Sequence, residues 1–194
     1  GRVTLLWIAA LCGFTALLMY FYPMLKADLD NFLKLIDNMP DIVKAAFGLY
    51  TATLGTPMGY YCFAFTYTSL FAMIQAANLG VGILSREERE KTADFLLTKP
   101  VSRTRILAAK LLAALTLLLA TNLIYTGLTA AMLHSLDGEL ALRPLLLINT
   151  SLLITQWIFF CLGLAVSVMA SKIRAVLPVS LGLVFVFYAI SAFA

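Results

Sequence analysis

Long apolar stretches alternate with short charged ones along this chain. Five stretches of about 20 residues or more contain no Asp, Glu, Lys or Arg: 3–25, 45–85, 111–136, 144–171 and 175–194. A helix of roughly 20 apolar residues covers the 30 Å of hydrocarbon in a bilayer, so each stretch is long enough to span a membrane. The stretches are continuously apolar and lack the period of two that is typical of barrel strands, which predicts helices.

Breaks within these stretches set the expected spans. Pro23 ends the first, and the stretch 45–85 would be about 60 Å long as one helix, so Gly55 and Pro57 are expected to break it. Hydrophobic residues make up 62% of the chain and charged residues 12%, against roughly 25% charged in soluble domains. The sequence therefore predicts an all-α, polytopic membrane protein, with 1–194 as a single transmembrane domain and spans at 4–22, 57–84, 103–133, 144–171 and 175–194.

The segment 24–48, between the first two spans, is amphipathic. Its apolar residues recur at helical spacing, and its other face is charged with Lys26, Asp28, Asp30, Lys34 and Asp37. This pattern predicts a helix over 24–39 on the outer membrane surface, and Pro40 is expected to separate it from a short second helix that Asp41 caps. A lid over an exit path and a helix packed on the ends of the spans are both compatible with it, and packing is favoured because amphipathicity requires only the burial of one face. The apolar residues are Leu25, Leu29, Phe32, Leu33, Ile36 and Met39.

Positive charge is distributed unevenly between the two sides of the predicted membrane. Of the fourteen Lys and Arg residues, ten lie before the first span, in the charged stretch from Leu84 to Lys110 and between the last two spans, and four lie in the other two segments. By the positive-inside rule, the N-terminus and the central segment face the cytoplasm. The net charge of +4 is thus a topology signal, which indicates a lipid bilayer and no nucleic acid as the surroundings of the chain.

The central segment, 85–102, combines dense charge with an apolar cluster. Eleven charged residues lie between Leu84 and Lys110, and Phe95, Leu96 and Leu97 stand in a row among them. Large apolar residues on a solvated loop are typical of a partner surface or of a fold-back onto the membrane, and we favour the partner. Ser85 and Glu88 have the spacing of a capping box, which predicts that a new cytoplasmic helix starts there.

Several kinds of chemistry have no sequence signal. There is no phosphate-binding GxxxxGK[ST] loop, no His, Cys or carboxylate cluster with metal-ligand spacing and no nucleophile–base pair, so neither catalysis nor a metal site is expected. Ion-coupled carriers place ionisable groups inside the membrane, and the predicted span interiors have none. Polar residues of the spans are candidates for a substrate path, although hydrogen bonding between helices is their commoner use; they are Tyr60, Tyr67, Gln75, Asn78, Asn122, Tyr125, Asn149 and Gln156.

The central segment resembles the ABC-2 type permease family, the integral-membrane subunits of ATP-binding-cassette exporters. The similarity lies in Glu90, Thr92, Leu96-Leu97, the turn from Pro100 to Arg103 and the following Lys110. It implies that the 85–102 segment couples to a separate ATPase subunit through Glu87, Glu90, Lys91, Thr92, Phe95, Leu96, Leu97, Pro100 and Arg103.

The same resemblance implies two ATPase copies, which bind ATP and Mg, and a second, identical or different, permease subunit. No cofactor is expected in this chain, and its location is expected to be a bacterial inner or cell membrane. The family's leading interfacial helix and sixth span have no counterpart here, so we expect a fragment. The alternatives are a stand-alone channel or secondary carrier, and a non-transporting scaffold that recruits a cytosolic protein.

Overall fold

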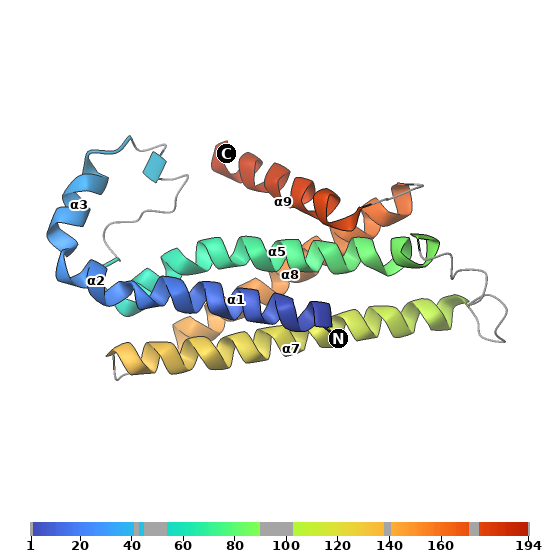
Figure 1. Ribbon diagram of the computed structural model, residues 1–194, viewed down its shortest axis with the longest axis horizontal. Coiled ribbons are helices and arrows are strands. Elements are labelled where there is room, and N and C mark those ends of the chain that lie inside the picture. The colour runs from blue at the N-terminus through green and yellow to red at the C-terminus, as the bar shows by residue number, and fades with distance from the viewer. Residues whose placement is uncertain are drawn as a thin grey trace. The chain divides into compact units, whose positions relative to one another are not determined.

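The computed structural model describes residues 2–40, 43–44, 54–89, 103–137, 141–170 and 175–193, and every regular element in these ranges is helical. This confirms the predicted all-α, polytopic class. The helices are α1 (Arg2–Tyr20), α2 (Tyr22–Ala27), α3 (Leu29–Asp37), α5 (Pro57–Arg89), α7 (Arg103–Asp137), α8 (Leu142–Met169) and α9 (Val176–Phe193) (Figure 1).

Four helical stretches among the described residues are long and apolar enough to cross a membrane: Val3–Ala27, Pro57–Ile83, Thr104–Leu136 and Leu142–Met169. The first of them runs through the short break between α1 and α2. The apolar part of α9, Val176–Ile190, is shorter than these four. Large apolar side chains are exposed on all of these helices, as expected for surfaces that face lipid.

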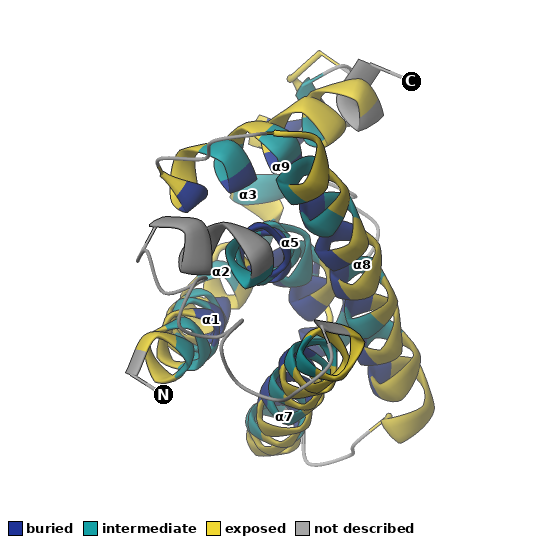
Figure 2. Ribbon diagram, turned by 90° about the vertical axis from the view of Figure 1, so that its right-hand side faces the viewer, coloured by how far each residue is buried: buried dark blue, intermediate teal, exposed yellow. Residues whose placement is uncertain are grey.

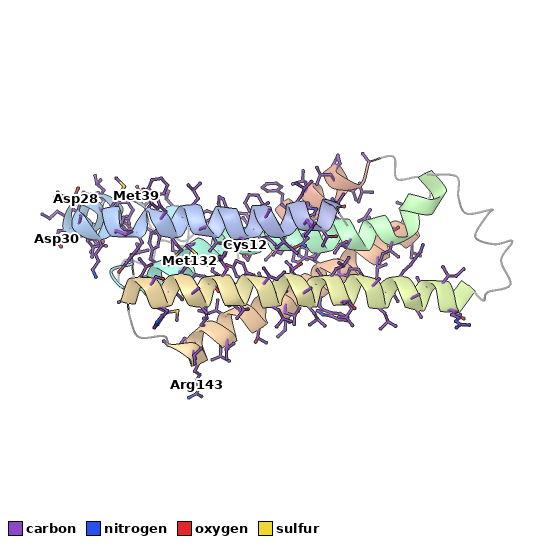
Figure 3. All side chains as sticks on the ribbon, turned by 60° about the horizontal axis from the view of Figure 1, so that its bottom comes forward. Cys12, Asp28, Asp30, Met39, Met132 and Arg143 are labelled. Carbon is purple, nitrogen blue, oxygen red and sulfur yellow. The ribbon has the colours of Figure 1, made fainter. Side chains whose placement is uncertain are left out.

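The α1–α3 region differs in detail from the expectation of one helix after Pro23. The chain turns at Phe21 and resumes as α2 with Pro23 in its first turn, and a second break at Asp28 separates α2 from α3. Within this region Ile36 is buried, whereas Asp28 and Asp30 are exposed at its end (Figure 3). The remainder of the predicted segment, apart from residues 43–44, lies outside the described residues beyond residue 40.

The α5 helix begins at Pro57, as predicted, but continues further than expected. It passes through Ser85 and ends at Arg89, so the new helix start predicted at the capping box is wrong. The residues just before Ser85 include no proline, and Gly82 alone costs a helix only about 1 kcal/mol relative to Ala. A capping box marks a helix start only where the residues before it are not already helical. The residues before Ser85 are helical, so α5 continues through the box.

The helices contribute to two compact units. The first contains residues 1–71, 123–150 and 192–194, and the second contains 72–122 and 151–191. Four of the described helices are shared, because α5, α7, α8 and α9 each give one part to the first unit and one to the second. Of these helices, α7 and α8 have a buried side and an exposed side, drawn in dark blue and yellow in Figure 2, whereas the described side chains of α5 are mostly buried or half-buried.

Within the second unit, α5 and α8 come into backbone contact at two glycines. A Cβ atom added to Gly80 would meet the carbonyl oxygen of Phe160 and would lie 3.0 Å from the amide nitrogen of Leu164. One added to Gly163 would meet the carbonyl oxygen of Ala77 in the same way. Small residues at such crossings let helix backbones approach closely in membranes, where packing rather than hydrophobicity drives association.

Candidate functional site

Buried polar side chains are the chemically distinctive feature of the described spans. They are all uncharged, and most of them belong to two hydrogen-bonded clusters, one in each compact unit. Backbone groups inside these helices are already paired, so the polar side chains have to find partners among themselves or on neighbouring carbonyls. The set is Thr15, Thr68, Gln75, Thr121, Asn122, Thr129, Asn149, Gln156 and Ser180.

In the first unit, the tyrosine–threonine cluster joins α1, α5, α7 and α8. At one end, the hydroxyl oxygens of Thr15 and Thr68 are 2.9 Å apart, and Tyr125 Oη lies 3.4 Å from Thr15 Oγ1. At the other end, Tyr61 donates a 2.7 Å hydrogen bond to Asn149 Oδ1, with its hydroxyl 3.5 Å from that of Tyr125. The cluster consists of Thr15, Tyr61, Thr68, Tyr125, Thr129 and Asn149.

Every member of the tyrosine–threonine cluster has a hydrogen-bond partner. The side-chain nitrogen of Asn149 donates to Thr129 Oγ1 over 3.3 Å, and Thr129 donates to the carbonyl oxygen of Tyr125 over 3.0 Å. Tyr61 and Tyr125, at most 1% exposed, fill the centre of the cluster with their rings. A fully satisfied buried network rigidifies the helices that contribute to it, because losing one member leaves its partner unpaired.

In the second unit, the amide cluster consists of Gln75, Thr121, Asn122 and Gln156, from α5, α7 and α8. Gln75 donates to Thr121 Oγ1 over 3.4 Å, Gln156 donates to Gln75 Oε1 over 3.4 Å, and Asn122 donates to Gln156 Oε1. The hydrogen bonds therefore run in one direction through three amide side chains.

Two backbone carbonyls fix the direction of these amide hydrogen bonds. Asn122 also donates to the carbonyl of Leu118 over 3.0 Å, and Gln156 also donates to that of Ala72 over 3.5 Å. Turning either amide over would place two oxygens against each other. As a result, Asn122 Oδ1 is a buried acceptor without a hydrogen-bond partner among the described residues.

The structure groups most of the predicted path residues, although none of these contacts tests a role in transport. Gln75, Asn122 and Gln156 meet in the amide cluster, and Tyr125 and Asn149 meet in the tyrosine–threonine cluster.

The other three predicted path residues lie apart from both clusters. Tyr60 donates to the carbonyl of Leu18 over 3.1 Å, and its ring lies 5.3 Å from that of Tyr22. Tyr67 packs edge-on against Phe63, and Asn78 is half-buried.

Several cluster members were not predicted from the sequence. Thr15, Thr68, Thr121 and Thr129 each donate to a carbonyl of their own helix four residues earlier, so they interrupt no apolar pattern. Tyr61 lies in an aromatic-rich run from Tyr60 to Tyr67, which does not distinguish it from packed aromatic residues. The only available signal was spacing: Tyr61 and Thr68 are seven residues apart and hence lie on one face of α5.

Most of the predicted coupling residues lie outside the described part of the chain. Glu90, Lys91, Thr92, Phe95, Leu96, Leu97 and Pro100 fall in the undescribed range 90–102. Glu87 belongs by its backbone to the last turn of α5, and Arg103 is the first residue of α7. Their predicted role remains a prediction.

The polar groups of both clusters can form hydrogen bonds to one another and to neighbouring carbonyls. No group of three His, Cys, Asp or Glu residues in the described ranges is arranged to hold a metal ion.

Lys110 Nζ, near the start of α7, donates a 3.1 Å hydrogen bond to the carbonyl oxygen of Ile83 in α5. Arg143, at the start of α8, is exposed and points outward (Figure 3).

Comparison with known families gives one match of nearly full length. The model of a family described as ABC-2 family transporter protein matches residues 2–194. Comparisons with curated proteins and with solved structures gave no match. The family match covers both compact units as well as the central segment, and it supports a role in membrane transport.

Proposed function

Because the chain belongs to the ABC-2 family of transporter proteins, we propose that it is the permease subunit of an ATP-binding-cassette exporter. Its helices line part of the substrate path, and the 85–102 segment couples that path to a separate ATPase subunit. The observation that carries this proposal is the family match over residues 2–194. The apolar run Phe95-Leu96-Leu97 inside a charged segment supports it, since buried apolar anchors with a polar rim are typical of protein interfaces.

In the proposed assembly, two ATPase subunits bind ATP and Mg, and this chain pairs with a second permease subunit. The chain itself hydrolyses no ATP. The assembly lies in a bacterial inner or cell membrane with the N-terminus in the cytoplasm, because the segments on that side have ten of the fourteen Lys and Arg residues. The 85–102 segment then faces the compartment in which ATP is available.

Both polar clusters contribute hydrogen-bonding groups to the proposed path. Their buried side chains are uncharged, which favours an amphipathic, peptide-like or lipid-like cargo over an inorganic ion. The same feature counts against an ion-coupled carrier, because such carriers use ionisable groups within the membrane. A scaffold that only recruits a cytosolic protein would not change the rate at which the ATPase subunit hydrolyses ATP, whereas an exporter would.

The experiment compares substitutions in the central segment of the complete permease. We expect Phe95→Asp and Leu97→Asp to lose the ATPase on co-purification, because truncating an interface anchor costs about 2 kcal/mol or more, a roughly thirtyfold loss of affinity, and a buried charge costs more. Glu88→Gln is the control: the sequence predicts a solvated position for Glu88, where a charge contributes about 0–1 kcal/mol, so this variant should retain the ATPase.

Rates of ATP hydrolysis and the amount of permease in the membrane are measured in parallel. The wild-type permease should change the hydrolysis rate of its cognate ATPase and should show none of its own. If the aspartate variants retain the ATPase as well as Glu88→Gln does, the apolar run is not the docking site. If both variants are absent from the membrane, the run instead packs on the permease's own helices.

A further inference from the structure

Lys110 connects the two helices that lead into and out of the 85–102 segment. Its side chain is half-buried, and Nζ donates a 3.1 Å hydrogen bond to the carbonyl oxygen of Ile83 in α5. A carbonyl oxygen has two lone pairs, so it can accept the ammonium group in addition to the N–H of its own helix. A cationic side chain near the end of a span usually extends toward water, whereas this one contacts the neighbouring helix.

The contact lies at a similar distance from both ends of the central segment. At 1.5 Å per residue, Ile83 is about 9 Å from the end of α5 at Arg89, and Lys110 is about 10 Å from the start of α7 at Arg103. Each helix therefore extends by about two turns beyond the contact.

The same part of α5 is fixed on a second side by α8. Ala77 and Gly80 are in close backbone contact with Gly163, within the two turns that precede Ile83. Glycine contacts of this kind leave no room for the two helices to slide without separating. The stretch of α5 from residue 77 to 83 is thus held by α8 through packing and by α7 through Lys110.

We propose that Lys110 is a positioning residue that clamps α5 to α7, so that ATP hydrolysis in the partner subunit displaces both helices together. The coupling role rests on the proposed function, whereas the contact between α5 and α7 can be tested without it. A methionine at this position matches the length of the lysine stem and removes the charge and the donors. An arginine retains both.

The first measurement tests the clamp without any partner. Nitroxide labels at Gly82→Cys and Leu112→Cys, in a background without native cysteines, report the distance between α5 and α7 by double electron–electron resonance. Leu112 is exposed, and a Cβ at Gly82 meets no atom within 4 Å. Lys110→Met should broaden the distance distribution. Losing a charge-assisted hydrogen bond lowers the ratio of clamped to unclamped molecules about tenfold. Lys110→Arg should restore the narrow distribution.

The second measurement uses the complex of the permease with its cognate ATPase in nanodiscs. We expect Lys110→Met to co-purify with the ATPase but to shift its hydrolysis rate toward that of the free ATPase, and Lys110→Arg to behave as wild type. Arg105→Met is the control, because it removes an exposed cation from the same helix and should leave the rate unchanged.

The outcomes separate the clamp from the proposed function. A distance distribution that stays narrow in Lys110→Met overturns the clamp. A broadened distribution with an unchanged hydrolysis rate overturns the coupling role, because the contact would then be only structural. A wild-type permease that binds no ATPase overturns the proposed function and the coupling role together, and the distance measurement still decides whether the clamp exists.

Discussion

Gly80 of α5 lies where the backbone of α8 comes closest, so replacing it with alanine tests this helix crossing directly. The added Cβ would lie 3.0 Å from the amide nitrogen of Leu164 and 3.2 Å from the carbonyl carbon of Gly163, with the carbonyl oxygen of Phe160 nearer still. Carbon atoms pack best at about 3.5–4.0 Å. The two helices must therefore separate by at least about 0.5 Å, which also loosens the contacts beside the crossing.

Gly82 provides a matched control on the same helix. A Cβ added there meets no atom within 4 Å, so Gly82→Ala changes the helix propensity of α5 without the steric contact. The propensity gain, about 0.5–1 kcal/mol, is common to both substitutions. The difference between them is therefore the cost of overpacking, about 1–3 kcal/mol.

The assay is thermal unfolding of the purified protein in nanodiscs, followed by intrinsic tryptophan fluorescence. For a chain of this size, 1 kcal/mol changes the midpoint by about 2–4 °C, so Gly80→Ala should unfold about 2–12 °C below Gly82→Ala. The reciprocal variant, Gly163→Ala, should show a similar decrease, because its Cβ would meet the carbonyl oxygen of Ala77. Equal midpoints for Gly80→Ala and Gly82→Ala would refute the close backbone contact.

Replacing Tyr61 with phenylalanine removes the donor to Asn149, and we expect it to lower the free energy of unfolding by about 0.6–2 kcal/mol. The exposed Tyr20→Phe should leave it unchanged, and equal values for the two variants would mean that the buried bond contributes nothing. In intact cells that express single-cysteine variants of a cysteine-free protein, a cysteine in place of Asp30 should react with an impermeant thiol reagent in the medium. A cysteine in place of Lys172 should not. External labelling at position 172 would reverse the orientation that follows from the positive charges.

Helix class and approximate helix positions could be predicted because the bilayer fixes both the length and the polarity of a span. The charge-free stretches and Pro57 were sufficient to place the beginning of α5. Local signals were less reliable. The capping box at Ser85 does not end or restart α5, and the break at Asp28 divides a segment in which only one helix was expected.

The grouping of polar residues could not be predicted, for a physical reason. A helix that is apolar on all sides has no stripe that fixes its rotation, so the sequence does not indicate which side chains face each other. Asn122 and Gln156 were recognisable as polar residues, but their hydrogen bond depends on the rotation of α7 and α8. Thr15 gave no signal at all, because its hydroxyl bonds to its own helix.

Those threonine bonds have a consequence for biosynthesis. The hydroxyl of Thr15 meets that of Tyr125, which is 110 residues later in the chain. At about 5–20 residues per second, a ribosome supplies this partner roughly 5–20 s after α1 has been synthesised. During that interval, the bond from Thr15 to the carbonyl of Leu11 keeps its proton paired. The helix can therefore enter the lipid with this hydroxyl paired before any other helix arrives.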